Sequence, residues 1–401
     1  MAKIVSGEAN LGTCSECLKS DGVWRGSRGG SDPGSGRERY LAGAPALPFR
    51  RNERQRLMTE ASIQVVYTDP GGEGYHCVLH MARLAAELLN GKLVLVQPGS
   101  PTATDKLRGI LLPRKRSRSS CLLICPSPAH LDSILLVQNW RHNFSRIVAW
   151  VFDSFWTDWI PSWARASRIF DHVFVTERED LIAWRRKIHA PVDWLPWGSD
   201  VLNLGSSDPV RQFDLLRFGR QPKEWDDDIV NARVCQSIGL DFHGRPQSLS
   251  DATDNERGLM RMLSKAKFTL AFSNRVSPGV NTHPKREYIT GRWTDSLAAG
   301  ATVAGIPPQS ESVQSLLWPE ALLDIRTVNQ AEGLKVIGSM VRAWTAERAQ
   351  LNYIRSLETL DWRWRFKTLA EALNTHSTQL HGELERLTEV IRSRRPVATI
   401  R

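Results

Sequence analysis

The sequence lacks the features that would assign it to a membrane-spanning or secreted class. It contains no apolar run of about 18 residues, and its N-terminus has no apolar segment of the kind found in signal peptides. Six cysteines among 401 residues are too few to form a disulfide framework. We therefore expect a cytoplasmic protein in a reducing compartment, with at most peripheral contact at the inner membrane face.

Motifs for metal and phosphate binding are also scarce. Cys14 and Cys17 form a single CxxC pair, without a second pair or a histidine at a zinc-binding spacing. The glycine loop "PGGEGYH" at 70–76 is not a GxGxxG fingerprint and contains no P-loop lysine. Three aspartates at 226–228 fit the first turn of a helix better than a metal site. We therefore expect neither a metal nor a cofactor.

Most of the net charge of +10 lies at the two ends of the chain. Residues 1–57 hold ten basic and six acidic side chains, and the last ten residues hold four arginines and no acid. Because the rest of the chain is close to neutral, nucleic acid is not an expected partner of the folded part. The Gly, Ser and Arg content of 1–57 predicts a disordered basic tail, with Met58 as an alternative start. Basic ends would suit contact with an anionic membrane surface.

From residue 63 onward, short apolar runs alternate with helical patterns. The first run, "IQVVYTD", leads through the glycine loop into a segment whose apolar residues repeat at helical spacing. Four further runs are apolar throughout, as parallel strands buried on both faces require: 92–98, 120–126, 145–153 and 171–176. This alternation predicts a Rossmann-like domain over residues 58–205.

A second series of strands and helices begins after a polar, unpatterned segment near residue 205. We expect a second Rossmann-like domain over 206–370, with a helix over 285–299, and then a C-terminal helix and basic tail over 371–401. The predicted fold class is α/β, with two Rossmann-like domains facing across a cleft and a helical C-terminus.

Candidate site residues come from the loops that follow the strands, because ligands of open α/β sheets bind there. Gly71 and Gly72 would let backbone amides approach a phosphate or a sugar closely. Arg220, with Lys223, would neutralise a diphosphate. Several of the 15 tryptophans cluster in 149–166, either as core packing or as an aromatic wall for a sugar or lipid acceptor.

An acceptor-side base has two candidates, Asp153 at a strand end and His76 after the glycine loop. A pair of acids, Glu287 and Asp295, stands in the helix expected over 285–299. Eight residues turn an ideal helix by about 800°, so both carboxylates would reach one broad side. They could bind the hydroxyls of a ribose, or they could simply be a helix-dipole charge and a solvated acid.

The glycine loop with its helix, the segment "FGRQPK", and the acid pair followed by "SLAAGATVAGIPP" resemble glycosyltransferases of the GT-B fold, of group-1 type. The resemblance covers residues 63 to about 375. It implies that Asp295 holds the ribose of a nucleotide-sugar donor and that Glu287 lies by the donor hexose and phosphate. It also implies that Arg220 and Lys223 contact the diphosphate. The chain departs from the family pattern in having Asp295 where glutamate is usual.

The resemblance further implies that Gly71 and Gly72 let donor and acceptor meet, with acceptor binding in 58–205 and donor binding in 206–370. The expected activity is metal-independent, hexosyltransferase-like sugar transfer, of the kind used in polysaccharide biosynthesis, to a glycan, a lipid-linked or a small-molecule acceptor. Two alternatives stay open. A nucleotide-sugar epimerase uses the same fold, and a catalytically inactive protein could bind nucleic acid or membrane through its basic tails.

Overall fold

The computed structural model describes residues 62–113, 117–279 and 282–395. These ranges belong to one compact unit of the chain, Met58–Arg401. The expected basic tail over 1–57, with its CxxC pair, lies outside the described residues, as does the end of the C-terminal basic segment.

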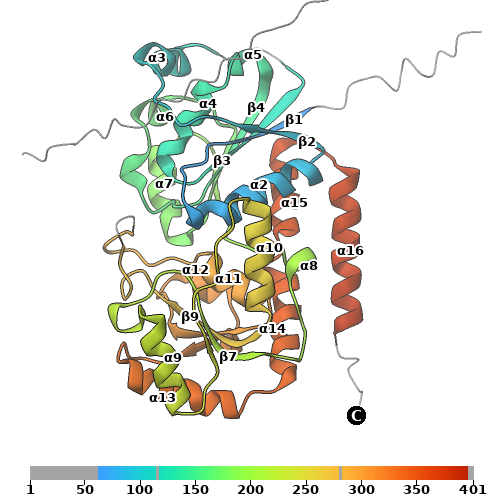
Figure 1. Cartoon of the computed structure of the whole chain (residues 1–401). Coiled ribbons are helices and arrows are strands. Elements are labelled where there is room, and N and C mark those ends of the chain that lie inside the picture. The colour runs from blue at the N-terminus through green and yellow to red at the C-terminus, as the bar shows by residue number, and fades with distance from the viewer. Residues whose placement is uncertain (1–61, 114–116, 280–281, 396–401) are drawn as a thin grey trace, which may run out of the picture. The chain divides into compact units, whose positions relative to one another are not determined.

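A parallel sheet with the strand order β2-β1-β3-β4-β5-β6 forms the first lobe (Figure 1). Its strands are β1 (Ile63–Tyr67), β2 (Gly91–Leu95), β3 (Ser119–Cys125), β4 (Phe144–Val151), β5 (His172–Val175) and β6 (Val192–Trp194). In β3, Leu122 and Ile124 join one buried cluster, whereas Cys121 and Leu123 join another. Both faces of the sheet are therefore covered, which explains the continuous apolar runs.

Helices cover the two faces of the first sheet. They are α2 (His76–Leu88), α3 (Ala103–Leu111), α4 (Ser133–Leu136), α5 (Trp140–Asn143), α6 (Ser162–Ala166) and α7 (Leu181–Lys187). Helix α2 packs against β1 and β2, and its apolar residues Val78 and Met81 lie nearly one turn apart in the buried cluster. The start of α2 is thereby fixed just beyond the carboxyl end of β1.

A second parallel sheet, with the order β11-β10-β9-β7-β8, forms the second lobe. Its strands are β7 (Phe213–Arg217), β8 (Phe242–His243), β9 (Ala266–Phe272), β10 (Thr302–Ile306) and β11 (Leu322–Asp324). Its helices are α8 (Val201–Leu204), α9 (Asp228–Ser237), α10 (Ala252–Leu263), α11 (Gly291–Ala298), α12 (Glu311–Leu316), α13 (Gln330–Arg342) and α14 (Ala346–Thr359). Two parallel α/β sheets confirm the expected fold class.

One helix differs from the sequence prediction. The helix expected over 285–299 begins only at Gly291, where α11 starts, and the five residues before it are irregular. The side-chain amide of Asn274 donates to the carbonyl oxygen of Arg286 at 2.6 Å and holds this segment away from helical geometry. The prediction that Glu287 stands in this helix together with Asp295 is therefore wrong.

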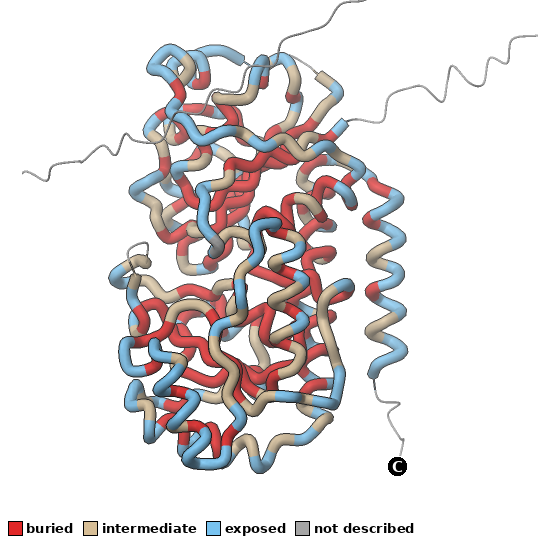
Figure 2. Tube along the Cα trace, viewed as in Figure 1, coloured by how far each residue is buried: buried red, intermediate tan, exposed pale blue. Residues whose placement is uncertain are grey.

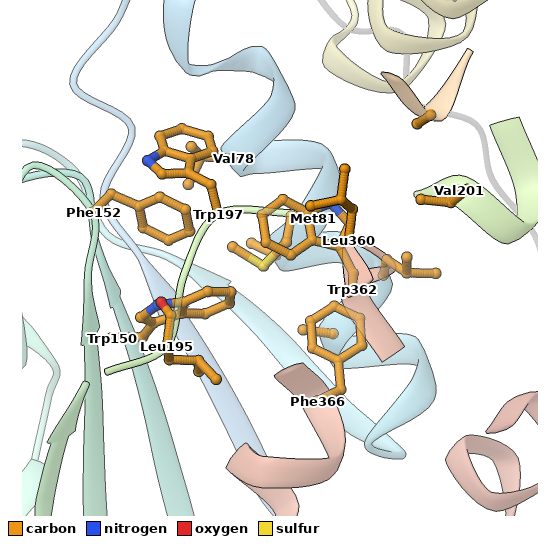
Figure 3. Close-up of a cluster of buried hydrophobic side chains, with 14 of the residues drawn as sticks. Val78, Met81, Trp150, Phe152, Leu195, Trp197, Val201, Leu360, Trp362 and Phe366 are labelled. Carbon is orange, nitrogen blue, oxygen red and sulfur yellow. The ribbon is translucent and has the colours of Figure 1, made fainter. Parts of the chain in front are cut away.

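The last two helices, α15 (Trp362–Leu373) and α16 (Thr378–Arg394), follow the second lobe in sequence. Residues up to 370 are expected to belong with that lobe, yet α15 packs on β3 and β4 of the first sheet. The ring of Trp362 lies 5.6 Å from that of Trp150, centroid to centroid, and Phe366 lies in the same buried cluster (Figure 3). Aromatic packing therefore brings the C-terminal segment back to the first lobe.

Two chain segments cross between the lobes side by side. One precedes α8 and the other precedes α15, and a parallel β-bridge joins Ser199 of the first to Asp361 of the second. Arg363 is fully buried beside this bridge, and its Nη1 donates to Asp200 Oδ1 at 2.9 Å and to Asp361 Oδ1 at 3.2 Å. The buried guanidinium thus neutralises two carboxylates, one from each crossing segment.

Burial is concentrated in the strands and the helices that cover them, whereas α16 is mostly exposed (Figure 2). Only Leu380 and Leu387 of α16 are buried. In the described ranges, no helix has both the length and the apolar character needed to cross a membrane.

Candidate active site at the carboxyl ends of the strands

Each sheet has one point at which the chain changes its direction of growth. In the first sheet β1 lies between β2 and β3, and in the second β7 lies between β8 and β9. Open parallel sheets bind ligands beyond the strand ends at such switch points. The loops that follow β1 and β7 carry Gly71 and Gly72 on one lobe and Arg220 on the other, so the candidate loops occupy the expected positions.

The glycine loop adopts a backbone conformation that L side chains rarely adopt. Gly71 has φ +80° and Gly72 has φ +89°, and the amide of Gly71 donates to Asp69 Oδ1 at 2.9 Å. A Cβ built at either glycine would meet no atom within 4 Å. The space in front of the loop is therefore open, and the backbone conformation alone calls for glycine. The amide of Tyr75 donates to the Gly72 carbonyl oxygen at 3.2 Å, which ties the loop to the start of α2.

The two candidate bases lie at this edge of the first lobe. The Tyr75 hydroxyl donates to Asp153 Oδ2 at 3.0 Å. Burial raises the pKa of Asp153 to about 7, against a smaller lowering by the Tyr75 hydrogen bond. A carboxyl group with this pKa can accept and release a proton near neutral pH. His76 begins α2, and its buried Nδ1 has no hydrogen-bond partner among the described residues.

Two guanidinium groups meet on the second lobe. Arg220 Nε donates to the Ser277 carbonyl oxygen at 2.6 Å, and Arg292 Nη1 donates to the carbonyl oxygen of Arg220 at 2.7 Å. Burial, and less strongly the neighbouring charge of Arg220, lower the pKa of Arg292 to about 10, and Tyr288 opposes this shift. A Cβ at Gly219 would lie 2.6 Å from Arg292 Cδ, so the glycine makes room for the second arginine. Lys223 is exposed at the start of the short 3-10 helix Lys223–Trp225.

Tyr288 connects the carboxylate of one lobe with the cations of the other. Its ring stacks on that of Phe155 at 4.1 Å between centroids, and its hydroxyl is hydrogen-bonded by Arg220. Burial raises the pKa of Tyr288 to about 12, the charge of Asp153 adds to the rise, and Arg220 and Arg292 oppose it. Asp153, Arg220 and Arg292 are therefore each near enough to act on Tyr288. Tyr288 and Arg292 could not be identified from the sequence beyond their place between the two predicted acids.

The first of those acids, Glu287, lies in the irregular segment beside Tyr288. Its side chain is mostly buried, and Oε2 accepts the Gln309 amide at 3.3 Å and lies 3.8 Å from Arg275 Nη1. Its neighbour Arg286 forms an ion pair with Asp180 of the first lobe. This segment therefore reaches across to the first lobe at the level of the strand ends.

Asp295 lies elsewhere, in a buried layer between α2, α10 and α11. A Cβ at Gly291 would lie 2.7 Å from Asp295 Oδ2 and 3.7 Å from Cys77 Sγ. Burial raises the pKa of Asp295 to about 7, against a lowering by the Ser199 hydroxyl. Burial also raises the pKa of the neighbouring Glu256, and the charge of Asp295 adds to that rise. The structure does not bring Asp295 and Glu287 together on one helix face, because Glu287 precedes the helix.

The tryptophan-rich segment divides between core and surface. Trp150 and Trp163 are buried. Trp156 and Trp159 instead stack on each other, with ring centroids 4.3 Å apart and planes 1° apart, and Trp159 is 46% exposed. The core-packing interpretation therefore holds for Trp150 and Trp163. The aromatic wall for an acceptor stays a prediction for the stacked pair, which adjoins the buried rings of Phe155 and Tyr288.

No protein-family model and no curated protein matches the sequence. Similar solved structures include a glycosyltransferase involved in avilamycin A biosynthesis, at 13% identity and TM-score 0.40, covering 83% of this chain and 98% of that chain. An α,α-trehalose-phosphate synthase (UDP-forming) from Burkholderia vietnamiensis has 10% identity and TM-score 0.42, covering 84% of this chain and 100% of its own. The lipopolysaccharide outer core galactosyltransferase WaaB has 10% identity and TM-score 0.38, covering 78% of this chain and 98% of its own. All three structures are less than 15% identical to this chain and have TM-scores below 0.5.

Proposed function

We propose that the protein is a glycosyltransferase that moves a sugar from a nucleotide-sugar donor to an acceptor hydroxyl. The observation that carries this proposal is the meeting, around Tyr288, of a carboxyl group with a pKa of about 7 and two guanidinium groups. Sugar transfer needs both a carboxylate base and fixed positive charge. A base accepts the proton of the acceptor, and fixed positive charge stabilises the diphosphate that leaves.

In the proposed reaction, Asp153 accepts the proton of the acceptor hydroxyl while the acceptor oxygen bonds to the anomeric carbon of the donor. The bond between that carbon and the diphosphate oxygen breaks, and its electron pair stays on the nucleoside diphosphate. Arg220 and Arg292 stabilise the negative charge that develops there. Because two guanidinium groups supply this charge, we propose that the transfer requires no metal.

The donor would bind between the glycine loop and the second lobe. Gly71 and Gly72 leave open space in which backbone amides can face the donor or acceptor, and Glu287 borders the position proposed for the hexose. The ribose role that the resemblance gives to Asp295 stays part of the proposal. It requires its carboxylate, now only 4% exposed, to become accessible when the donor binds.

The stacked tryptophans suggest the nature of the acceptor. Flat, partly exposed rings at Trp156 and Trp159 suit the apolar face of a sugar or an acyl chain. We therefore propose a glycan or a lipid-linked acceptor rather than a small polar molecule. Replacing both rings with alanine should raise the acceptor KM and leave the donor KM unchanged.

Donor turnover tests the proposal directly. The full chain is incubated with UDP-, GDP- and ADP-sugars, and release of the nucleoside diphosphate is followed with and without oligosaccharide or lipid-linked acceptors. We expect slow hydrolysis of one donor class and faster release with an accepted acceptor. The assignment would be contradicted if the double variant Arg220→Gln/Arg292→Gln released the nucleoside diphosphate as fast as wild type does. It would also be contradicted if wild type neither bound nor hydrolysed any of the donors.

A further inference from the structure

Helix α3 exposes a strip of large apolar side chains on the first lobe. Leu107, Ile110 and Leu111 are 55%, 37% and 66% exposed, and Leu112, directly after the helix, is 43% exposed. Positions separated by three and four residues lie on one side of a helix, so the first three form a single stripe. In Figure 1, α3 lies at the end of the first lobe away from the strands of the second lobe. The stripe is therefore remote from the contacts at Tyr288.

The opposite side of α3 packs against the first lobe at a glycine. Gly109 is the buried residue of the helix, and a Cβ there would lie 3.3 Å from Leu135 Cδ2 and 3.3 Å from Trp163 Cε3. The helix begins with a capping box in which Thr102 and Asp105 bind each other's backbone amides. The cap and the glycine contact hold α3 in place, and Leu107 and Leu111 stay more than half exposed. Its outward apolar stripe is thus a feature of the folded helix, not of a frayed end.

Basic side chains border the stripe. Lys106 and Arg108 adjoin Leu107 in sequence, which places one on each flank of the apolar side at about 100° of rotation. The guanidinium of Arg141 donates to the carbonyl oxygen of Pro113, just beyond the C-terminal end of the helix. The acid of the helix, Asp105, is turned back to the cap at Thr102. The surroundings of the stripe are therefore cationic.

The chemistry of this surface fits a lipid bilayer better than a protein partner. Protein interfaces concentrate aromatic and methionine side chains and are depleted in lysine. The α3 stripe instead combines leucine and isoleucine with flanking cations, which is the arrangement of helices that lie in the headgroup region of anionic membranes.

We propose that α3 docks the protein on an anionic lipid bilayer. Leu107, Ile110 and Leu111 enter the boundary between headgroups and acyl chains, and Lys106 and Arg108 contact lipid phosphates. The proposal does not depend on the glycosyltransferase assignment, because none of these residues belongs to the candidate active site. It goes beyond the basic ends of the chain by assigning the contact to a folded surface.

Sedimentation with vesicles tests this surface. The full chain is mixed with phosphatidylcholine vesicles that contain either no anionic lipid or about 30% phosphatidylglycerol. We expect binding to the anionic vesicles, and a loss of at least about tenfold in affinity for the variant Leu107→Gln/Leu111→Gln. The matched control is Ile182→Gln/Ile229→Gln, because these two side chains are 64% and 66% exposed on α7 and α9. The control should bind as wild type does.

A second variant separates charge from apolar insertion. Lys106→Gln/Arg108→Gln should reduce the preference for phosphatidylglycerol at low salt. Binding of the leucine variant equal to that of the control would overturn the proposal, because the basic ends of the chain would then carry the contact. Light scattering without lipid measures whether the protein self-associates through this stripe. A wild-type dimer that Leu107→Gln/Leu111→Gln converts to a monomer would assign the stripe to self-association instead.

Discussion

Replacing Asp153 with asparagine should abolish sugar transfer and at the same time stabilise the protein above neutral pH. The two effects have one cause, the burial that raises the pKa of Asp153 from 3.8 to about 7. The shift of about three units corresponds to about 4 kcal/mol by which the site disfavours the charged carboxylate. Asparagine keeps the shape and the acceptor oxygen for Tyr75, but it carries no charge and accepts no proton from a substrate.

The sign of the stability effect follows from proton binding. In the unfolded chain Asp153 releases its proton near its ordinary pKa of 3.8, and in the folded protein it does so near pH 7. Between these values the folded state holds the extra proton, so its contribution to stability falls as pH rises from about 4 to about 7. Above pH 7 Asp153→Asn should therefore exceed wild type in its free energy of unfolding by up to about 4 kcal/mol. Near pH 4 the difference should shrink.

Activity should show the opposite dependence. The carboxylate must be deprotonated to accept the acceptor proton, so kcat/KM of wild type should fall about tenfold per pH unit below pH 7 and level off above it. Tyr75→Phe removes a hydrogen bond that favours the charged form, so it should move this limb to higher pH. Asp153→Asn should lower kcat/KM about 100- to 10,000-fold, and the remaining kcat/KM should no longer fall below pH 7.

The assay pairs nucleoside diphosphate release from pH 5 to 9 with urea unfolding at the same pH values. Asp158→Asn is the matched control, because Asp158 lies five residues further along in the same segment, is exposed, and pairs with Lys187 at 3.0 Å. A variant at Asp153 that is stabilised but retains the wild-type rate and limb would refute the base assignment. A variant that is destabilised at pH 8 would refute the account of the raised pKa.

Four further substitutions test the remaining groups. Arg292→Gln should lower kcat/KM about 100-fold by removing one donor to the leaving diphosphate. The exposed control Arg245→Gln should leave kcat/KM unchanged. An equal loss of kcat/KM in both variants would contradict a specific role of Arg292. Asp295→Ala should raise the donor KM and Glu287→Ala should mainly lower kcat, and an unchanged donor KM would remove the ribose role. Gly72→Ala should lower the free energy of unfolding by about 1 to 2 kcal/mol in urea titrations because of φ +89°, and no loss would show that the loop can change its backbone.

The strands and the loops that follow them could be predicted because their signals are local. A strand buried on both faces needs a continuous apolar run, and the run in β3 or β4 identifies the strand without reference to distant residues. The carboxyl ends of β1 and β7 then locate Gly71 and Arg220. Their positions in the fold follow from the order of elements, and their roles stay predictions.

The start of α11 and the surroundings of Asp295 could not be predicted, since both depend on residues far away in sequence. Asn274 holds the segment before α11, and nothing near Glu287 signals that contact. Glu256 comes from another helix to lie near Asp295. Spacing along a helix says which residues share a side, but it does not say what covers that side.

The paired crossing segments at Ser199 and Asp361 have a mechanical consequence. A single linker would leave the rotation of the two lobes unrestricted. Two linkers that are joined by a β-bridge and held together by the buried Arg363 restrict that rotation. Any change in the separation of the two lobes would then have to bend both crossing segments together.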